Sequence, residues 1–151
     1  MKSILILSLL FTVFNSAYTN MDIELVRQNY GLAASNETLC NKMIEELKTN
    51  DKNTIYLAYL GAYQTIWANH VLSPFSKLNT FNAGVKNIEK AIKKDPNNVE
   101  IRFLRYSVQK NAPSFLGYNK EKAEDEKFLK KSKEDIKSKI LLKMINDLLN
   151  D

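Results

Sequence analysis

The feature that most constrains the fold of this chain is the segment 53–71, NTIYLAYLGAYQTIWANHV, which has side chains to bury on two sides of one helix. At about 100° per residue, bulky side chains gather on one side: Tyr56, Tyr59, Leu60, Tyr63, Trp67 and His70. Small residues gather on the other: Ala58, Gly61, Ala62, Thr65 and Ala68. A helix with apolar surface all round needs partners on both sides. We therefore expect this segment to be the central helix, with a neighbouring backbone close to its small stripe.

The composition predicts an all-α protein. The chain has 151 residues, 44% of them hydrophobic and 26% charged, which suits one globular domain. Only four glycines and three prolines are present, and Leu, Ile, Lys, Glu and Ala are abundant. These residues favour helices joined by short connections.

The N-terminus has the three regions of a secretory signal peptide. Lys2 supplies a positive start, residues 4–14 form an apolar run, and Asn15, Ser16 and Ala17 form a small or polar exit. The run is shorter than the roughly 20 apolar residues that span a bilayer, so we predict cleavage after Ala17 rather than an uncleaved anchor. The mature chain, residues 18–151, is then a single exported domain, periplasmic or extracellular, without a stable membrane span.

Apolar periodicity predicts roughly six or seven helices arranged as antiparallel hairpins. Their expected ranges are 22–33, 38–48, 53–71, 75 or 78 to 94, 99–112, 119–131 and 132 or 134 to 150. We expect Asn98 and Asn119 to cap the helices that follow them, and His70 to cap the end of the central helix. We expect residues 132–150 to form a closing amphipathic helix, whose apolar face has Ile136, Ile140, Met144 and Leu148 at i,i+4 spacing and is widened by Leu141 and Ile145. The apolar loop 115–118 should tuck against the core.

Residues 81–98, FNAGVKNIEKAIKKDPNN, resemble the second helix of a tetratricopeptide repeat and the turn after it. Counting back from Pro96, the bulky, small, apolar and small positions of that motif fall on Phe81, Gly84, Ile88 and Ala91. The first helix of the motif is matched by Leu60-Gly61, followed by a longer connection than a standard repeat has. The resemblance covers about residues 55–130, one degenerate repeat and part of another. Because stacked arrays need at least about three repeats, it implies a small closed helical domain.

The chain also resembles a group of small exported bacterial proteins that are described as repeat-like. The resemblance rests on the signal peptide, the aromatic helix, the turn 95–98, the segment Arg102-Phe103-Leu104-Arg105 and the loop 112–118. It implies a fold and a location, and it brings no activity with it.

The sequence offers no set of residues that predicts catalysis. Cys40 and His70 are single, so a His and Cys metal site is not expected, and their spacing does not suggest a nucleophile and base. Isolated glycines exclude a phosphate-binding loop. Acidic residues at 45–46 and 124–126 lie in stretches typical of solvated helix faces. We therefore predict no enzyme, cofactor or metal, and we expect Cys40 to be a small buried residue, an intermolecular disulfide being the alternative.

The charge pattern argues against a nucleic-acid partner. Signal cleavage removes one cation and lowers the net charge from +5 to +4. The remaining surplus is interleaved with acids, as in residues 120–139, whereas a nucleic-acid groove needs clustered cations with stacking aromatics.

Six residues are candidates for a partner-binding groove, because Tyr, Trp and Arg are enriched at binding hot spots. These candidates are Tyr56, Tyr59, Tyr63, Trp67, Arg102 and Arg105. Each has a second interpretation: the aromatic stripe can be core, and the two arginines can form a solvated face or pair with the acids of residues 121–126.

Two functions remain at this point. The first is a non-catalytic module that binds an unknown protein or peptide, and the second is a small enzyme or ligand carrier with an internal aromatic pocket. We expect a monomer or a weak homo-oligomer, with residues 136–149 as a possible self-association helix.

Overall fold

The structure, a computed structural model, describes residues 21–151, so the predicted signal peptide lies outside the described residues. All regular structure in this range is helical, which confirms the predicted all-α class. The α-helices are α1 (Ile23–Tyr30), α2 (Glu37–Lys48), α3 (Thr54–Trp67), α4 (Pro74–Lys94), α5 (Val99–Asn111), α6 (Lys122–Ser132) and α7 (Lys139–Asn150). Two short 3-10 turns, η1 (Ser114–Leu116) and η2 (Lys133–Asp135), interrupt the later connections.

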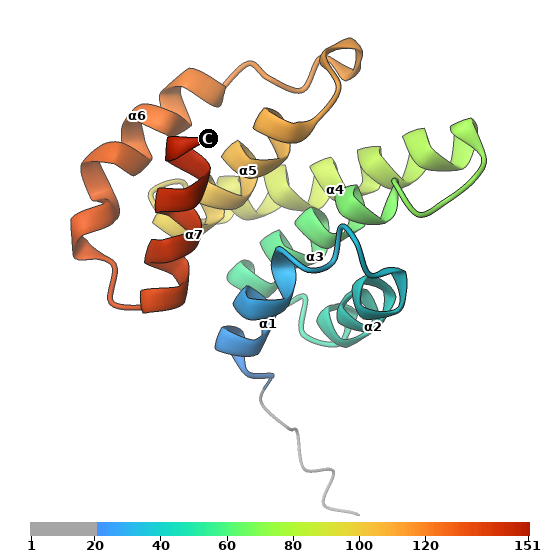
Figure 1. Ribbon diagram of the computed structural model, residues 1–151, viewed down its shortest axis with the longest axis horizontal. Helices are drawn as coiled ribbons and strands as arrows, with labels where there is room; N and C mark the ends of the chain where they lie inside the picture. The colour runs from blue at the N-terminus through green and yellow to red at the C-terminus, as the bar shows by residue number, and fades with distance from the viewer. Residues whose placement is uncertain (1–20) are drawn as a thin grey trace, which may run out of the picture.

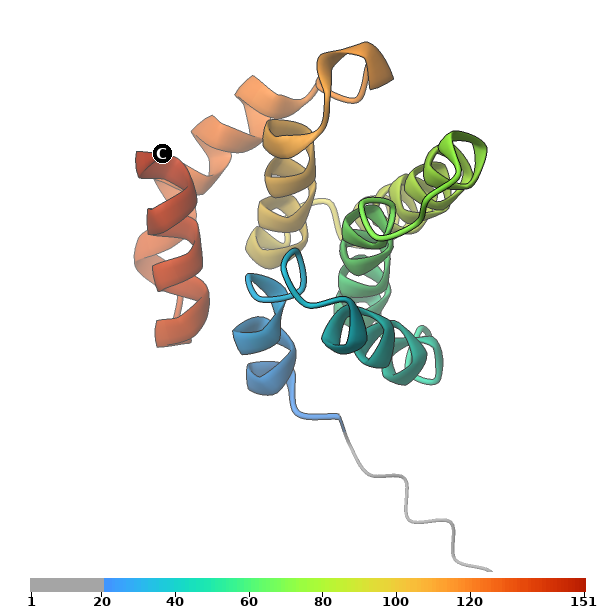
Figure 2. The same cartoon turned by 45° about the vertical axis from the view of Figure 1, so that its right-hand side comes forward.

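The helices form three groups across the molecule. The α3–α4 hairpin, with α2 beside it, lies on one side, α6 and α7 lie on the other, and α1 and α5 stand between them (Figures 1 and 2). The most extensive helix contact is between α3 and α4, followed by that between α2 and α3. The α3–α4 hairpin is therefore the framework on which the rest of the fold is assembled.

The small stripe of α3 allows a neighbouring backbone to approach closely, as predicted, and the structure shows that this neighbour is α4. A Cβ atom at Gly61 would lie 2.5 Å from the carbonyl oxygen of Gly84, and a Cβ atom at Gly84 would lie 2.5 Å from that of Gly61. The two backbones are thus in contact at this crossing, and only glycine fits at either position. The rest of α3 is covered by α2 and α5 and, through Tyr30 and Val26, by α1, which confirms α3 as the central helix.

Side-chain caps fix the start of most helices in the N-terminal two thirds of the fold. The carboxylate or amide oxygens of Asp22, Asn36, Asn53 and Asn98 each accept a hydrogen bond from a backbone N–H in the first turn that follows. Capping by Asn98 is as predicted from the sequence.

The helix starts predicted for the C-terminal third are wrong. Helix α6 begins after Glu121, without a side-chain cap, so Asn119 lies in the connection instead of capping it. Helix α7 begins at Lys139 because the Ser138 hydroxyl accepts a 3.2 Å hydrogen bond from the Leu141 N–H. Ile136, predicted to lie inside this helix, ends η2 in an extended conformation. Apolar spacing alone did not reveal the break between these elements.

The end of α3 also differs from prediction. Regular helix stops at Trp67, and His70 does not cap it: its Nε2 atom lies 2.9 Å from the Ala33 carbonyl oxygen instead. This contact ties the end of the central helix to the connection between α1 and α2.

The core runs between α3, α5 and the helices that cover them. Its largest fully buried side chains include Tyr59, Tyr63, Met43, Ile88 and Leu104. Cys40 is fully buried, as predicted, and burial raises the pKa of its thiol to about 11. No helix among residues 21–151 has the length and apolar character that crossing a membrane requires.

Candidate functional site

The aromatic stripe of α3 is core at its centre. Tyr59 and Tyr63 are fully buried, and Tyr30 of α1 meets both rings edge-on, with centroids 5.9 and 5.6 Å away. The Tyr63 hydroxyl donates a 2.8 Å hydrogen bond to the Val26 carbonyl oxygen. Because both side chains are fully buried, Tyr59 and Tyr63 cannot contact a partner in this structure. Both residues are therefore part of the core, the second of their two interpretations.

A buried charge pair completes this part of the core. The Tyr59 hydroxyl donates a 2.7 Å hydrogen bond to the Glu100 carboxylate, which is only 5% exposed. Arg27 reaches the same carboxylate with two hydrogen bonds of 2.7 and 2.6 Å. Burial and the neighbouring Glu100 charge hold the pKa of Tyr59 well above its ordinary value. Arg27 therefore balances the charge of the Glu100 carboxylate, and hydrogen bonds within the fold use its oxygens. This arrangement suits a structural role better than acid catalysis.

Arg102 and Arg105 fasten α6 to α5. Arg105 binds the Asp125 carboxylate with its Nε and Nη2 atoms at 2.6 and 2.8 Å, and Arg102 adds a 2.9 Å contact. Asp125 is fully buried. The Arg102 guanidinium also stacks over the Phe128 ring, 4.4 Å from its centroid. The pairing with acids of residues 121–126 is thus the interpretation that the structure bears out, and Arg105 is only 5% exposed.

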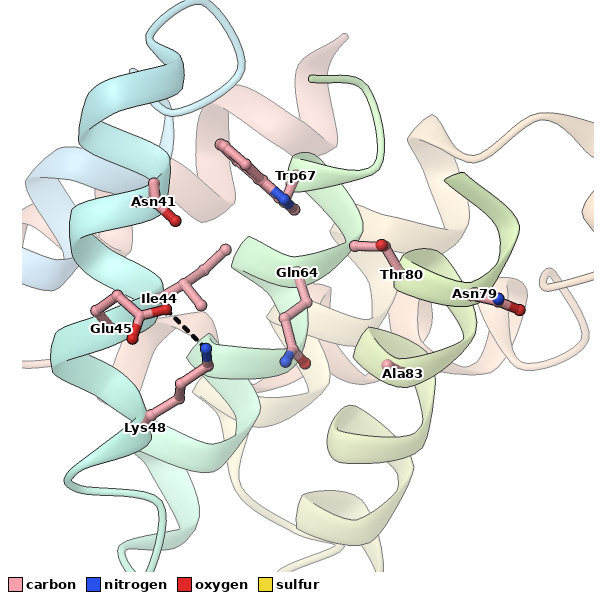
Figure 3. A pocket seen from close by; sticks show the side chains of 9 residues that line it. All are labelled: Asn41, Ile44, Glu45, Lys48, Gln64, Trp67, Asn79, Thr80 and Ala83. Atoms are coloured by element: carbon pink, nitrogen blue, oxygen red, sulfur yellow. Dashed lines mark hydrogen bonds and ion pairs between the residues drawn. The ribbon is translucent and has the colours of Figure 1, made fainter. Parts of the chain in front are cut away.

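Tyr56 and Trp67, the two ends of the stripe, are half-buried. The Tyr56 hydroxyl donates a 2.5 Å hydrogen bond to the Met21 carbonyl oxygen. Trp67 lines a shallow hollow of about 380 Å³ between α2, α3 and α4 (Figure 3). We call this hollow the polar cleft, because most of its lining side chains carry amide, hydroxyl or charged groups: Asn41, Glu45, Lys48, Gln64, Asn79 and Thr80.

A larger hollow lies on the other side of the same hairpin. It has a volume of about 730 Å³ and is lined by the ends of α1, α3 and α5, the beginning of α4, and η1. We call it the apolar groove, after the side chains that dominate its wall: Ile66, Leu78, Phe81, Val108, Phe115 and Leu116. None of the six candidate residues lies among the described residues that line it. Of the six, only Trp67 lines a hollow, the polar cleft, among the residues that the structure describes.

The rim of the apolar groove carries large side chains that the fold leaves in solvent. Phe115 is 84% exposed and Leu78 is 46% exposed, although both line the groove. Beside the lining residue Pro74, Leu72 is 95% exposed and Phe75 is 74% exposed. The prediction that the loop 115–118 tucks against the core is correct for Tyr118, whose ring packs edge-on against Phe81, and wrong for Phe115. Exposed apolar side chains grouped around a hollow mark interaction sites.

Part of the lining of the apolar groove is polar, and two of its polar contacts are made within the fold. The Tyr30 hydroxyl lies 3.1 Å from the Ser107 hydroxyl, and Asn111 donates a 2.8 Å hydrogen bond to the Ser107 carbonyl oxygen. Burial raises the pKa of Tyr30 to about 12, against the effect of the Ser107 hydrogen bond. Tyr30 is therefore neutral at physiological pH and cannot act as a base there.

Two local features shape the groove. Ser73 caps α4 and Pro74 occupies its first turn, so α4 starts well beyond the core and its first turns stand in solvent. Gly117 adopts a left-handed conformation, with φ 65°, and closes the turn that carries Phe115. The sequence signals for this site were therefore Ser73-Pro74, next to the exposed Leu72 and Phe75, and Gly117, next to the loop that carries Phe115.

The part of the chain that the structure describes contains no group of three or more side chains arranged to hold a metal ion. Comparison with known proteins gives no further assignment: no protein-family model, no curated protein and no solved structure matches this chain.

Proposed function

We propose that this protein is an exported, non-catalytic interaction module that binds a segment of another protein in the apolar groove. The observation that carries the proposal is the exposure of Phe115, Leu78, Phe75 and Leu72 around a preformed hollow. Exposing such side chains costs solubility and contributes little to folding, so a partner that covers them is the simplest reason for their presence. Grooves of this kind accept an apolar helix face or an extended peptide.

Other features support the same proposal. The resemblance of residues 55–130 to a tetratricopeptide repeat implies a scaffold of helical hairpins, and the N-terminal pattern of residues 1–17 implies export. The titratable groups near the aromatic stripe, Glu100 and Tyr59, are engaged in structural hydrogen bonds. The proposed location is the periplasm or the cell exterior, and the proposed state of the free protein is a monomer or a weak homo-oligomer.

A ligand carrier is the second candidate, because about 730 Å³ lies within the range of small-molecule pockets, roughly 300–1,000 Å³. The internal aromatic pocket expected for a carrier would have involved Tyr56, Tyr63 and Trp67. Among the residues described as lining the groove, none of these three is present. The protein-binding proposal is preferred because Leu72 and Phe75 are exposed beside the hollow but do not line it, so a small ligand inside it would leave them uncovered.

Photo-crosslinking at neighbouring positions of α4 tests the proposal. Leu78 lines the apolar groove and Asn79 lines the polar cleft, so benzoylphenylalanine at each position samples a different hollow of the hairpin. In an envelope extract from the source organism, we expect a discrete protein adduct from position 78 that excess unlabelled wild-type protein suppresses. Equal adducts from both positions, or none from position 78, would contradict the proposal.

A further inference from the structure

The charges around the apolar groove are distributed unevenly along the chain. The parts of the chain that form its walls fall within three segments, 28–36, 52–88 and 101–120. None of these segments contains Asp or Glu, and all 17 acidic residues of the chain lie elsewhere. The same segments contain cations, and one of them, Lys77, lines the groove. None of the described residues that line the groove is therefore acidic.

The cationic character is concentrated at one end of the groove. Among the described residues that line it, Lys77 alone carries a charged side chain, and that side chain is exposed. The start of α4, at Pro74, also lines the groove. A 21-residue helix presents the positive end of its dipole there. Lys77 and the start of α4 thus place positive potential beside an apolar surface.

We propose that the segment bound in the apolar groove is an acidic amphipathic segment of a partner protein, with apolar side chains in the groove and carboxylates beside Lys77 and the start of α4. This inference rests on the proposed function and adds the charge of the partner. Opposite charges at a groove rim steer association and suppress binding of cationic segments.

A second copy of this chain fits the groove less well. A two-fold contact would place the same surface of both copies face to face. That arrangement would bring Lys77 towards Lys77 and would set two acid-free walls against each other. The charge distribution therefore favours a different, acidic partner over self-association.

An anionic lipid bilayer carries negative charge, as an acidic segment does, but its flat surface does not match the shape of a groove. Its surface would touch the protruding residues Leu72, Phe75 and Phe115, and it would leave the floor of the groove uncovered. The groove lining also includes Asn69 and Asn111, whose side chains are exposed. Amide groups in a concave wall suit a peptide, whose backbone and polar side chains can hydrogen-bond to them.

Two labelled peptides of equal length test the inference by fluorescence anisotropy. Both are 16-residue helices with the same Leu and Phe face at i, i+3, i+4 and i+7 spacing, and their polar faces carry Glu in one and Lys in the other. We expect wild-type protein to bind the Glu peptide at least tenfold more tightly at low salt. The ratio should collapse at high salt, because the screening length falls to about 3 Å at 1 M.

Charge reversal supplies the matched control. In Lys77→Glu, the preference should be abolished or inverted. Lys86→Glu changes the net charge equally on an exposed position of the same helix outside the groove lining, and it should leave the preference nearly intact. Equal loss in both variants would overturn the local role of Lys77.

The possible failures can be told apart. The proposed groove function fails if both peptides bind the Leu78→Gln and Phe115→Gln variants with the same affinity as wild type. It also fails if neither peptide binds wild type. If both bind wild type equally and Leu78→Gln weakens both, the groove stands and the acidic inference is overturned. If the protein binds phosphatidylglycerol vesicles but neither peptide, the surface is a lipid-binding one. A dimeric sedimentation mass that Phe115→Gln abolishes would assign it to a second copy. Either result would overturn the proposal.

Discussion

The two faces of the α3–α4 hairpin differ in chemistry although they are built from the same two helices. On one face, Gln64 and Trp67 of α3 and Asn79 of α4 line the polar cleft. On the other, Ile66 of α3 and Leu78 of α4 line the apolar groove. The polar cleft has side chains that water can solvate, so it needs no partner. The groove has exposed apolar side chains that water solvates poorly, so it has a physical reason to bind something.

The difference also separates folding from binding. Residues around the Gly61–Gly84 crossing are buried and hold the hairpin together, whereas residues from Leu72 to Asn79 are exposed. Changes at the crossing should therefore affect both faces, and changes at the rim should affect one face and leave stability almost untouched.

Gly61→Val should have the largest effect, because it removes the support of both faces at once. Its Cβ atom would meet the Gly84 carbonyl oxygen at 2.5 Å and the Ile88 backbone nitrogen at 2.9 Å. Backbone atoms cannot rotate away, so α3 and α4 would have to separate. We expect a loss of about 4 kcal/mol or more in the free energy of unfolding, measured by urea denaturation.

Gly31→Val is the matched control for that change. Gly31 has φ −66° and nothing within 4 Å of the added Cβ position. We expect a change of no more than about 0.5 kcal/mol. Comparable losses in both variants would mean that helix propensity, and not the close crossing, is responsible.

Asp125→Ala should affect the groove face and spare the cleft. Its carboxylate is fully buried between Arg102 and Arg105, and α5 and α6 are joined through the connection that carries Phe115. Leaving Arg105 without its main partner should cost about 3 kcal/mol. The nearby Glu126→Ala, which breaks an exposed pair with Lys130, should leave the denaturation midpoint unchanged. Trp67, the one tryptophan of the chain, lines the cleft. Below the unfolding transition, quenching of its fluorescence by a soluble quencher should be the same in both variants as in wild type.

Helix positions and the central hairpin were predictable from sequence because their signals are local or strongly periodic. The cap at Asn98 follows from one residue type before a helix, and the small stripe around Gly61 predicts that a neighbouring backbone comes close, although it does not identify that neighbour as α4. The start of α7 was not predicted, because apolar residues continue at helical spacing through Ile136 while Ser138 provides the actual cap.

The site was harder to predict than the fold, because exposure is a property of the assembled structure. Tyr59 and Phe115 are both aromatic residues in apolar surroundings along the chain, yet one is fully buried and the other is 84% exposed. The difference arises from distant contacts: Tyr30 and Glu100 enclose Tyr59, whereas nothing in the described part of the chain covers Phe115. Sequence periodicity carries no information about such contacts between distant segments.

Tyr30→Phe tests the polar floor of the groove through its pH dependence. The folded-state pKa of Tyr30, about 12, exceeds the ordinary value of 10, so the contribution of the neutral phenol is complete below pH 10 and is lost as the pH rises from 10 to 12. At pH 7, the lost hydrogen bond to Ser107 should cost about 1 kcal/mol.

The variant should also be less sensitive to alkali. Between pH 10 and 12, its stability should fall by roughly 2 kcal/mol less than that of wild type, measured by urea denaturation at each pH. Parallel losses in both proteins would show that Tyr30 ionises as freely in the folded state as in the unfolded one.

Phe115→Gln should have the smallest effect on stability and the clearest effect on binding. The ring is 84% exposed, so replacing it should change the free energy of unfolding by no more than about 0.5 kcal/mol. The apolar dye bis-ANS should nevertheless bind several-fold more weakly, because the groove loses part of its wall. Asn79→Gln, in the polar cleft, should leave dye binding unchanged. A large loss of stability in Phe115→Gln would mean that the ring packs in solution and that the groove is closed, whereas unchanged stability with weaker dye binding would separate the residues that bind from those that fold.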